Sequence, residues 1–171
     1  PTPAAPVVQE LRPAAPNPSP SPDPSPDSSP TVDESAVPVV FATMEEAVRT
    51  IREGGSVVVM DDESRENEGD LIMSAELATA PQVAFFIRHS TGILCAPMTA
   101  DRAALLDLPR MVEKNGDPNG TAFTVTTDAV GTTTGVSAVD RCLTLHVLAD
   151  PSKGSGDIQR PGHVFPLVSR P

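Results

Sequence analysis

One stretch of ten residues, Asp61-Asp-Glu-Ser-Arg-Glu-Asn-Glu-Gly-Asp70, contains the side chains best suited to chemistry. Six of these residues carry carboxylates, so their negative charges repel one another unless a partner neutralises them. A divalent cation that prefers hard oxygen ligands, Mg²⁺ or Mn²⁺, is the usual partner, and Arg65 could hold an anionic substrate beside it. The stretch therefore predicts a metal-assisted site, with a solvated acidic loop as the alternative.

The segments on either side of the acidic stretch are predicted to be strands that fix its two ends. The apolar run Ser56–Met60 is expected to form a buried strand, and Leu71–Ala75 a second strand. Gly69 allows the sharp turn that returns the chain to the second strand. An EF-hand calcium loop fits poorly, because helices flank such a loop and the required alternation of oxygen ligands is absent.

Helices alternate with strands along the rest of the sequence. Thr43 begins a capping box with Glu46, and apolar residues follow at helical spacing as far as Ile51. The other predicted elements are a helix opened by Thr79-Ala-Pro-Gln82, a strand over Ile93–Ala96, a short helix over Ala100–Leu106, a strand over Phe123–Thr127 and a helix that Ser137 caps and that runs towards Asp150. The alternation predicts an α/β domain of the α+β type, in which helices pack around a mixed sheet.

Charge and composition disfavour several classes of protein. The 171 residues include 12 Lys and Arg against 23 Asp and Glu, a net charge of −11, which argues against binding nucleic acid. The apolar runs are much shorter than a membrane span requires. The two cysteines, Cys95 and Cys142, follow no metal-ligand spacing and are expected to stay reduced. His89 and His146 are expected to have structural roles.

The first 38 residues differ from the rest of the chain. They hold 12 of the 20 prolines, and the stretch from Pro13 to Pro30 has hardly any apolar side chain, so they are predicted to be a disordered leader, with residues 39–171 as a single domain. A ligand for a proline-reading domain is the alternative for this leader. Because the chain begins with Pro, a targeting peptide is expected upstream; the leader suits a protein of the plastid stroma, and also a bacterial cytoplasmic protein.

The acidic stretch resembles the signature of the 3,4-dihydroxy-2-butanone-4-phosphate synthase family of riboflavin biosynthesis. Segments in the family's order also resemble it over Ile87–Cys95, Leu106–Pro109, Thr121–Val125, Thr132–Arg141 and Arg160–Leu167, so the resemblance covers about residues 42–168. It implies a Mg²⁺-dependent lyase that converts ribulose 5-phosphate to 3,4-dihydroxy-2-butanone 4-phosphate and formate. It further implies a homodimer with active sites at the subunit interface.

The resemblance assigns roles to four residues of the acidic stretch. Glu66 matches a magnesium ligand that also meets the substrate. Arg65 and Asp70 match substrate-contacting residues, and Glu68 matches a residue with an acid–base or positioning role. Proton abstraction beside a carbonyl, with later steps that release water and formate, needs several such groups.

Further residues gain roles from the same resemblance. His163 matches a catalytic histidine, whose alternative is a histidine that anchors a strand. Cys95 matches an active-site cysteine, and its alternative is an ordinary buried strand cysteine. Thr133 and Thr134, beside Gly135, could donate to the substrate phosphate, although turn-building explains them equally well.

The sequence departs from the family at its end. The family's second magnesium ligand lies in a Gly-His-Thr-Glu segment, followed by a further catalytic glutamate, and neither occurs before Pro171. We therefore expect a fragment of a longer enzyme, in which a GTP cyclohydrolase II domain could follow. The rivals are a truncated, inactive homologue that serves as a dimerisation or interaction module, and a cation-binding acidic domain without chemistry.

Overall fold

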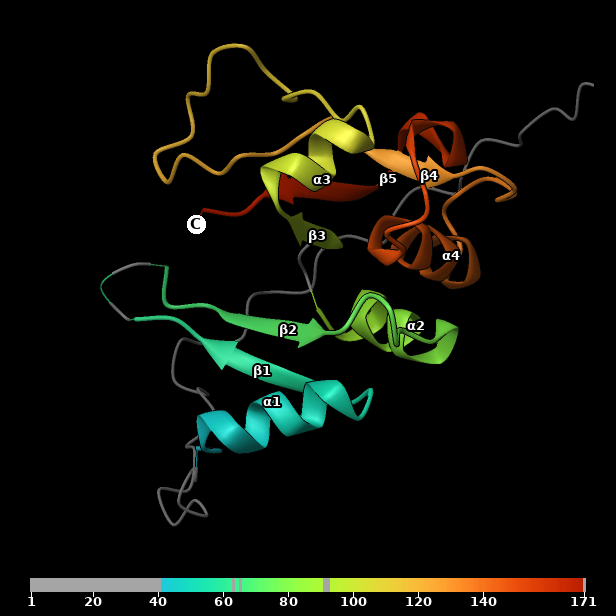
Figure 1. Cartoon of the computed structure of the whole chain (residues 1–171). Coiled ribbons are helices and arrows are strands. Elements are labelled where there is room, and N and C mark those ends of the chain that lie inside the picture. The colour runs from blue at the N-terminus through green and yellow to red at the C-terminus, as the bar shows by residue number, and fades with distance from the viewer. Residues whose placement is uncertain (1–40, 63, 65, 91–92, 171) are drawn as a thin grey trace, which may run out of the picture. The chain divides into compact units, whose positions relative to one another are not determined.

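The computed structural model describes residues 41–62, 64, 66–90 and 93–170. The predicted leader and Arg65 lie outside these residues. Contacts divide the chain into residues 1–40 and 41–171, and the second unit contains every element described. The elements are α1 (Met44–Arg52), β1 (Ser56–Met60), β2 (Gly69–Met73), α2 (Ala80–His89), β3 (Cys95–Met98), α3 (Ala100–Leu105), β4 (Thr127–Ala129), α4 (Ala138–Ala149), the 3₁₀ turn η1 (Ser155–Asp157) and β5 (Ile158–Val168) (Figure 1).

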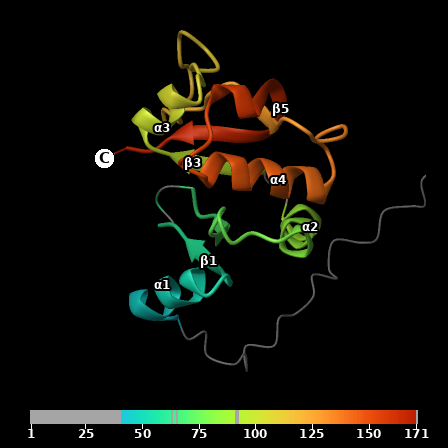
Figure 2. The same cartoon turned by 45° about the vertical axis from the view of Figure 1, so that its right-hand side comes forward.

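The strands form two sheets rather than one. β5 is the central strand of a three-stranded sheet, parallel to β3 and antiparallel to β4. β1 and β2 form a separate antiparallel hairpin, with α1 beside β1 (Figure 1). Helix α4 runs along the three-stranded sheet and contacts α2 (Figure 2). The predicted α+β class with a mixed sheet is confirmed.

The three long helices begin where their caps were predicted. The side chains of Thr43, Thr79 and Ser137 accept hydrogen bonds from the backbone N–H three residues later. In the first two helices Glu46 and Gln82 return a side-chain bond to the cap backbone. These bonds satisfy N–H groups that have no partner within the helix, so the local sequence determines the helix start.

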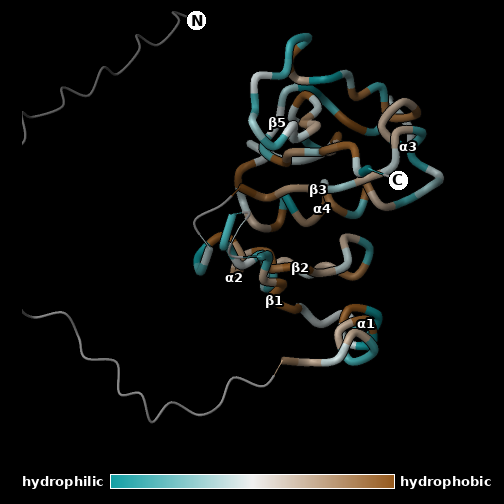
Figure 3. Tube along the Cα trace, turned by 90° about the vertical axis from the view of Figure 1, so that its left-hand side faces the viewer, coloured by the Kyte–Doolittle hydropathy of each residue, from teal (hydrophilic) through white to brown (hydrophobic). Residues whose placement is uncertain are grey.

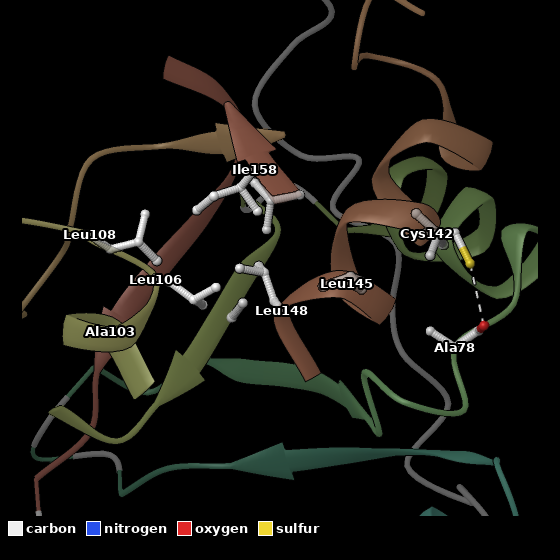
Figure 4. Packing of buried hydrophobic residues seen from close by; sticks show 11 residues of the cluster. Ala78, Ala103, Leu106, Leu108, Cys142, Leu145, Leu148 and Ile158 are labelled. Atoms are coloured by element: carbon white, nitrogen blue, oxygen red, sulfur yellow. Dashed lines mark hydrogen bonds between the residues drawn. The ribbon is translucent and has the colours of Figure 1, made fainter. Parts of the chain in front are cut away.

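The buried core lies between the three-stranded sheet and its helices. Leu106, Val83 and Val164 are completely buried. Figure 4 shows Leu148 of α4 beside Leu106 and Ile158, Leu145 of the same helix on the side of Cys142, and Cys142 donating to the carbonyl of Ala78. Beside this core β4 contacts both β5 and α4, and the backbone N–H of Ala129 donates to the hydroxyl of Thr144 in α4. These three elements carry the second group of site residues described below.

The prediction of a buried strand at Ser56–Met60 is wrong for burial although the strand exists. Val58, Val59 and Met60 are 61%, 46% and 54% exposed. Among the described residues β1 pairs with β2 alone and α1 packs against it, whereas Met73 of β2 packs against the buried core, so β1 is the less covered strand of the hairpin. Figure 3 shows hydrophobic colour along this hairpin. An exposed apolar surface of this kind is typical of a contact with another protein segment.

Other strand predictions differ in position. The second strand spans Gly69–Met73 rather than Leu71–Ala75, and the third spans Cys95–Met98 rather than Ile93–Ala96. Phe123 and Thr124 make isolated bridges, and β4 begins only at Thr127. β5 has 11 residues and was not predicted, because Pro161 and Gly162 within it are typical of turns.

Candidate functional site

The acidic loop between β1 and β2 is folded by one of its own carboxylates. Asp61 accepts hydrogen bonds from the backbone N–H groups of Glu66 and Glu68, at 3.1 and 2.8 Å. Its own N–H donates to the carbonyl of Glu68 at 3.1 Å. Asn67 takes a positive φ of 51°, which tightens the turn. Asp61 therefore shapes the loop.

Among the described residues of the loop, the exposed acidic residues are Asp62, Glu66, Glu68 and Asp70. The side-chain amide of Asn119 donates to Oε1 of Glu66 at 2.6 Å. Asn119 belongs to a loop far away in the sequence, so this bond holds Glu66 from outside the hairpin. The loop thus displays oxygen ligands of the kind that divalent cations bind.

Cys95, the first residue of β3, lies close to the acidic loop. Burial raises the pKa of its thiol above the ordinary value of 9.0, and the negative charge of Asp70 raises the pKa further. The side chain is therefore a neutral thiol near pH 7 and a poor nucleophile. This chemistry agrees with a half-buried strand cysteine that packs beside the site.

His163 lies in an irregular part of β5. The ladder with β4 steps from the pair Thr127–Val164 to the pair Asp128–Gln159, so residues 160–163 leave the regular register. This bulge brings His163 against Asp128, whose Oδ2 is 2.8 Å from Nδ1 of the imidazole. The backbone N–H of His163 donates to the other carboxylate oxygen at 2.9 Å. Bulges often redirect a side chain in this way.

The loop before α4 covers this pair. Gly135 adopts φ +79°, and a Cβ there would lie 1.9 Å from Oδ2 of Asp128 and 2.7 Å from Nδ1 of His163. Asp140, in the first turn of α4, accepts from the N–H and hydroxyl of Thr133, at 3.1 and 2.7 Å, and from the N–H of Gly135 at 3.1 Å. Both donors of Thr133 are thus engaged within the protein, which supports its turn-building role. The phosphate role of Thr134 stays a prediction.

Asp140 also gives an expected dependence of stability on pH. Its hydrogen bonds from Thr133 hold the pKa of its carboxyl below the ordinary value of 3.8. A carboxyl group whose pKa is lower in the folded than in the unfolded protein stabilises the fold at pH values above its unfolded-state pKa. This stabilisation is lost as the pH falls through the folded-state pKa. We expect Asp140→Asn to lower the urea midpoint at pH 7, with the difference from wild type shrinking below about pH 4. Urea unfolding at pH 7 and pH 3 measures this; a difference that grows on acidification would contradict it.

The predicted site residues fall into two groups. One group consists of Glu66, Glu68 and Asp70 of the acidic loop, together with Cys95 beside it. The other group consists of His163 and Thr133, which lie around Asp128. No hydrogen bond in the described part of the chain joins the two groups. Among these described residues no three His, Cys, Asp or Glu side chains form a metal cluster. A surface hollow of about 540 Å³, lined by Thr99, Arg110 and Arg170 among others, contains none of the predicted site residues.

The structural role expected for the other histidines agrees with their contacts. Nε2 of His146 lies 2.7 Å from the carbonyl of Ala78, and the ring of His89 packs against Phe85 with centroids 4.5 Å apart. No helix within residues 41–170, so far as they are described, is long and apolar enough to cross a membrane.

Sequence reasoning missed three side chains that contact predicted site residues: Asp128, Asn119 and Asp140. Asp128 is only 3% exposed, although an Asp between Thr127 and Ala129 carries no motif of its own. Asn119 lies 53 positions from the glutamate that it contacts. A buried carboxylate needs a partner, so the burial of Asp128 is the signal that identifies it, and burial is visible only in the fold.

Comparisons with known proteins agree with the predicted family. The family model described as 3,4-dihydroxy-2-butanone 4-phosphate synthase matches residues 45–171. The riboflavin biosynthesis protein RibBA of Salinispora arenicola is 54% identical over 131 residues, 76% of this chain and 31% of that protein. The 3,4-dihydroxy-2-butanone 4-phosphate synthase of Pyricularia oryzae is 51% identical over 129 residues, 74% of this chain and 55% of that protein.

A solved structure shares the fold as well. A crystal structure of a 3,4-dihydroxy-2-butanone 4-phosphate synthase in complex with two magnesium ions matches with a TM-score of 0.74 and 50% identity, covering 76% of this chain and 61% of that one. The chain therefore spans between about a third and three fifths of the length of these relatives. With a family model matching residues 45–171 and identities above 50%, the chain belongs to the 3,4-dihydroxy-2-butanone 4-phosphate synthase family.

Proposed function

We propose that the protein containing this chain converts ribulose 5-phosphate to 3,4-dihydroxy-2-butanone 4-phosphate and formate in riboflavin biosynthesis. The observation that carries the proposal is the match of the family model to residues 45–171, which includes the acidic loop and His163. The exposed carboxylates of the loop and an imidazole paired with a carboxylate supply the acid–base groups that the reaction requires. The same match argues against a simple cation-binding domain.

The residues present fit a divalent cation in part. Glu66 is an exposed carboxylate that Asn119 holds in place, and Mg²⁺ commonly binds one or two carboxylates together with waters and substrate oxygens. The related crystal structure that contains two magnesium ions supports this choice. When bound, Mg²⁺ would stabilise negative charge that develops on substrate oxygens. Mn²⁺, which prefers the same ligands, is the alternative ion.

The chain's own residues perform the remaining tasks. His163 exchanges protons through Nε2, because Nδ1 is engaged with Asp128. Glu68 and Asp70 position the hydroxyl groups of the substrate or move protons at the loop, and Arg65 binds the substrate. Cys95, neutral and half-buried, excludes water beside the loop.

We further propose that the protein is a homodimer in which each site combines the acidic loop of one subunit with His163 of the other. Two observations support this arrangement. The two groups of site residues make no hydrogen bond to each other within one described chain, and the β1–β2 hairpin exposes Val58, Val59 and Met60. An exposed apolar surface of this kind is suited to an interface between subunits.

The test of the proposed function is formate release from ribulose 5-phosphate by the full-length protein. We expect turnover with Mg²⁺, none after chelation by EDTA, and recovery when Mg²⁺ is restored. Formate is quantified with formate dehydrogenase, and the four-carbon product by mass spectrometry. Absence of formate at saturating Mg²⁺ from a folded protein would reject the enzymatic proposal and favour an inactive interaction module.

A further inference from the structure

We propose that Asp128 is a positioning residue for His163, holding its imidazole in the tautomer with a proton on Nδ1 and leaving Nε2 as the atom that exchanges protons. Only the use of Nε2 in catalysis rests on the proposed function. The tautomer and its cause rest on the geometry of this chain alone.

The carboxylate of Asp128 contacts His163 twice. One oxygen accepts the backbone N–H of His163 at 2.9 Å, and the other lies 2.8 Å from Nδ1. A carboxylate can only accept hydrogen bonds, so Nδ1 must carry the proton. The hydrogen bond from the backbone N–H fixes the orientation of the carboxylate. The imidazole therefore bonds to the other carboxylate oxygen in one orientation, with Nδ1 facing it. Nε2 makes no hydrogen bond among the described residues and remains available.

The surroundings of Asp128 isolate the pair from other partners. The Asp128 side chain is 4% exposed and the His163 side chain is 41% exposed, so the carboxylate is shielded from solvent while the imidazole is accessible to it. Gly135 closes over the contact at a distance that leaves no room even for a Cβ. A buried carboxylate is costly without compensation, and the bonds from His163 provide it.

The other charged groups near β5 already have partners. Arg160 pairs with Asp107, and Lys153 pairs with Asp157 at the start of the strand. Asp140 of α4 is bonded to Thr133 and Gly135 of the covering loop. Cys95, on the neighbouring strand β3, is opposite Phe165 in the ladder and is a neutral thiol near pH 7. Asp128 is therefore the group that orients His163.

The tautomer can be measured directly by ¹⁵N NMR. Protonated and unprotonated ring nitrogens of neutral imidazole differ strongly in ¹⁵N chemical shift, and the chain contains only three histidines. In ¹⁵N-histidine-labelled protein at alkaline pH we expect His163 to carry its proton on Nδ1. In Asp128→Asn the amide can accept the backbone N–H while its NH₂ group donates to Nδ1, so the proton should move to Nε2.

Asp107→Asn is the matched control. It makes the same change of charge at a carboxylate that pairs with Arg160 on the same strand, without contacting His163. This variant should keep the Nδ1 proton. A proton on Nε2 of His163 in the wild-type protein would overturn the proposal even if Asp128→Asn failed to fold, and an unchanged tautomer in folded Asp128→Asn would overturn it too.

The kinetic consequence is measured in the full-length enzyme. Asp128→Asn should lower kcat about 10²- to 10⁴-fold with little change in KM, because the substrate contacts remain while Nε2 can no longer accept a proton. Full activity of Asp128→Asn with the proton on Nε2 of His163 would overturn the positioning role of Asp128. Absence of activity in the wild type, together with the expected tautomers, would reject the proposed function and leave the role of Asp128 in place.

Discussion

Replacing Glu66 with Gln is expected to lower Mg²⁺-dependent formate release at least about 100-fold while the protein stays folded. Gln keeps the shape of the side chain but removes the charge that a hard cation prefers. The carboxylate is exposed and its bond from Asn119 has an amide counterpart in Gln, so little loss of stability should follow. Steady-state turnover across a Mg²⁺ titration measures the effect, and circular dichroism checks the fold. Wild-type activity at saturating Mg²⁺ would refute the metal role of Glu66.

A mixture of two inactive variants tests the shared site. If Glu66 of one subunit works with His163 of the other, a Glu66→Gln and His163→Gln heterodimer has one site with both changes and one intact site. Random mixing of refolded subunits should then restore about a quarter of the wild-type turnover. If both residues served the same site within one subunit, the mixture would stay inactive. Each variant refolded alone provides the baseline.

Local sequence determined the helices of this fold well, because their signals act within one turn. The hydroxyls of Thr43, Thr79 and Ser137 reach an N–H three residues away, and no distant contact is needed to predict that bond. Hydrogen bonds between residues far apart in the sequence leave no such local pattern. The Arg102 guanidinium donates to the carbonyls of Val147, Leu148, Asp150 and Lys153 near the end of α4, more than 40 positions away.

The candidate site was predicted only as far as its residues lie in recognisable segments. The acidic loop could be read from its composition, because charge repulsion is a property of the residues themselves. The orientation of His163 could not, since it depends on Asp128 across an irregular part of the β4–β5 ladder. The burial of β1 was predicted wrongly for the same reason. An apolar run indicates that a strand is suited to burial, but only the tertiary structure shows whether other elements bury it.

Replacing Gly162 with Ala is expected to destabilise the domain by more than about 4 kcal/mol. A Cβ at this position would lie 2.0 Å from the carbonyl carbon of Thr127 and 2.3 Å from the backbone nitrogen of Asp128. Backbone atoms cannot rotate away as a side chain can, so β4 and β5 would have to separate. Since β5 is the central strand of its sheet, the core around Val164 would open with them.

Gly156→Ala provides the matched control, because a Cβ there meets nothing within 4 Å and lies just ahead of the same strand. That variant should change stability by less than about 1 kcal/mol, and a slight gain would follow from the reduced freedom of the unfolded chain. Urea unfolding of the two variants beside wild type separates close backbone approach from the general effect of adding a methyl group. Equal urea midpoints for Gly162→Ala and Gly156→Ala would show that the backbones of β4 and β5 are less closely packed than in the structure. The bulge that brings His163 to Asp128 would then also be less closely packed.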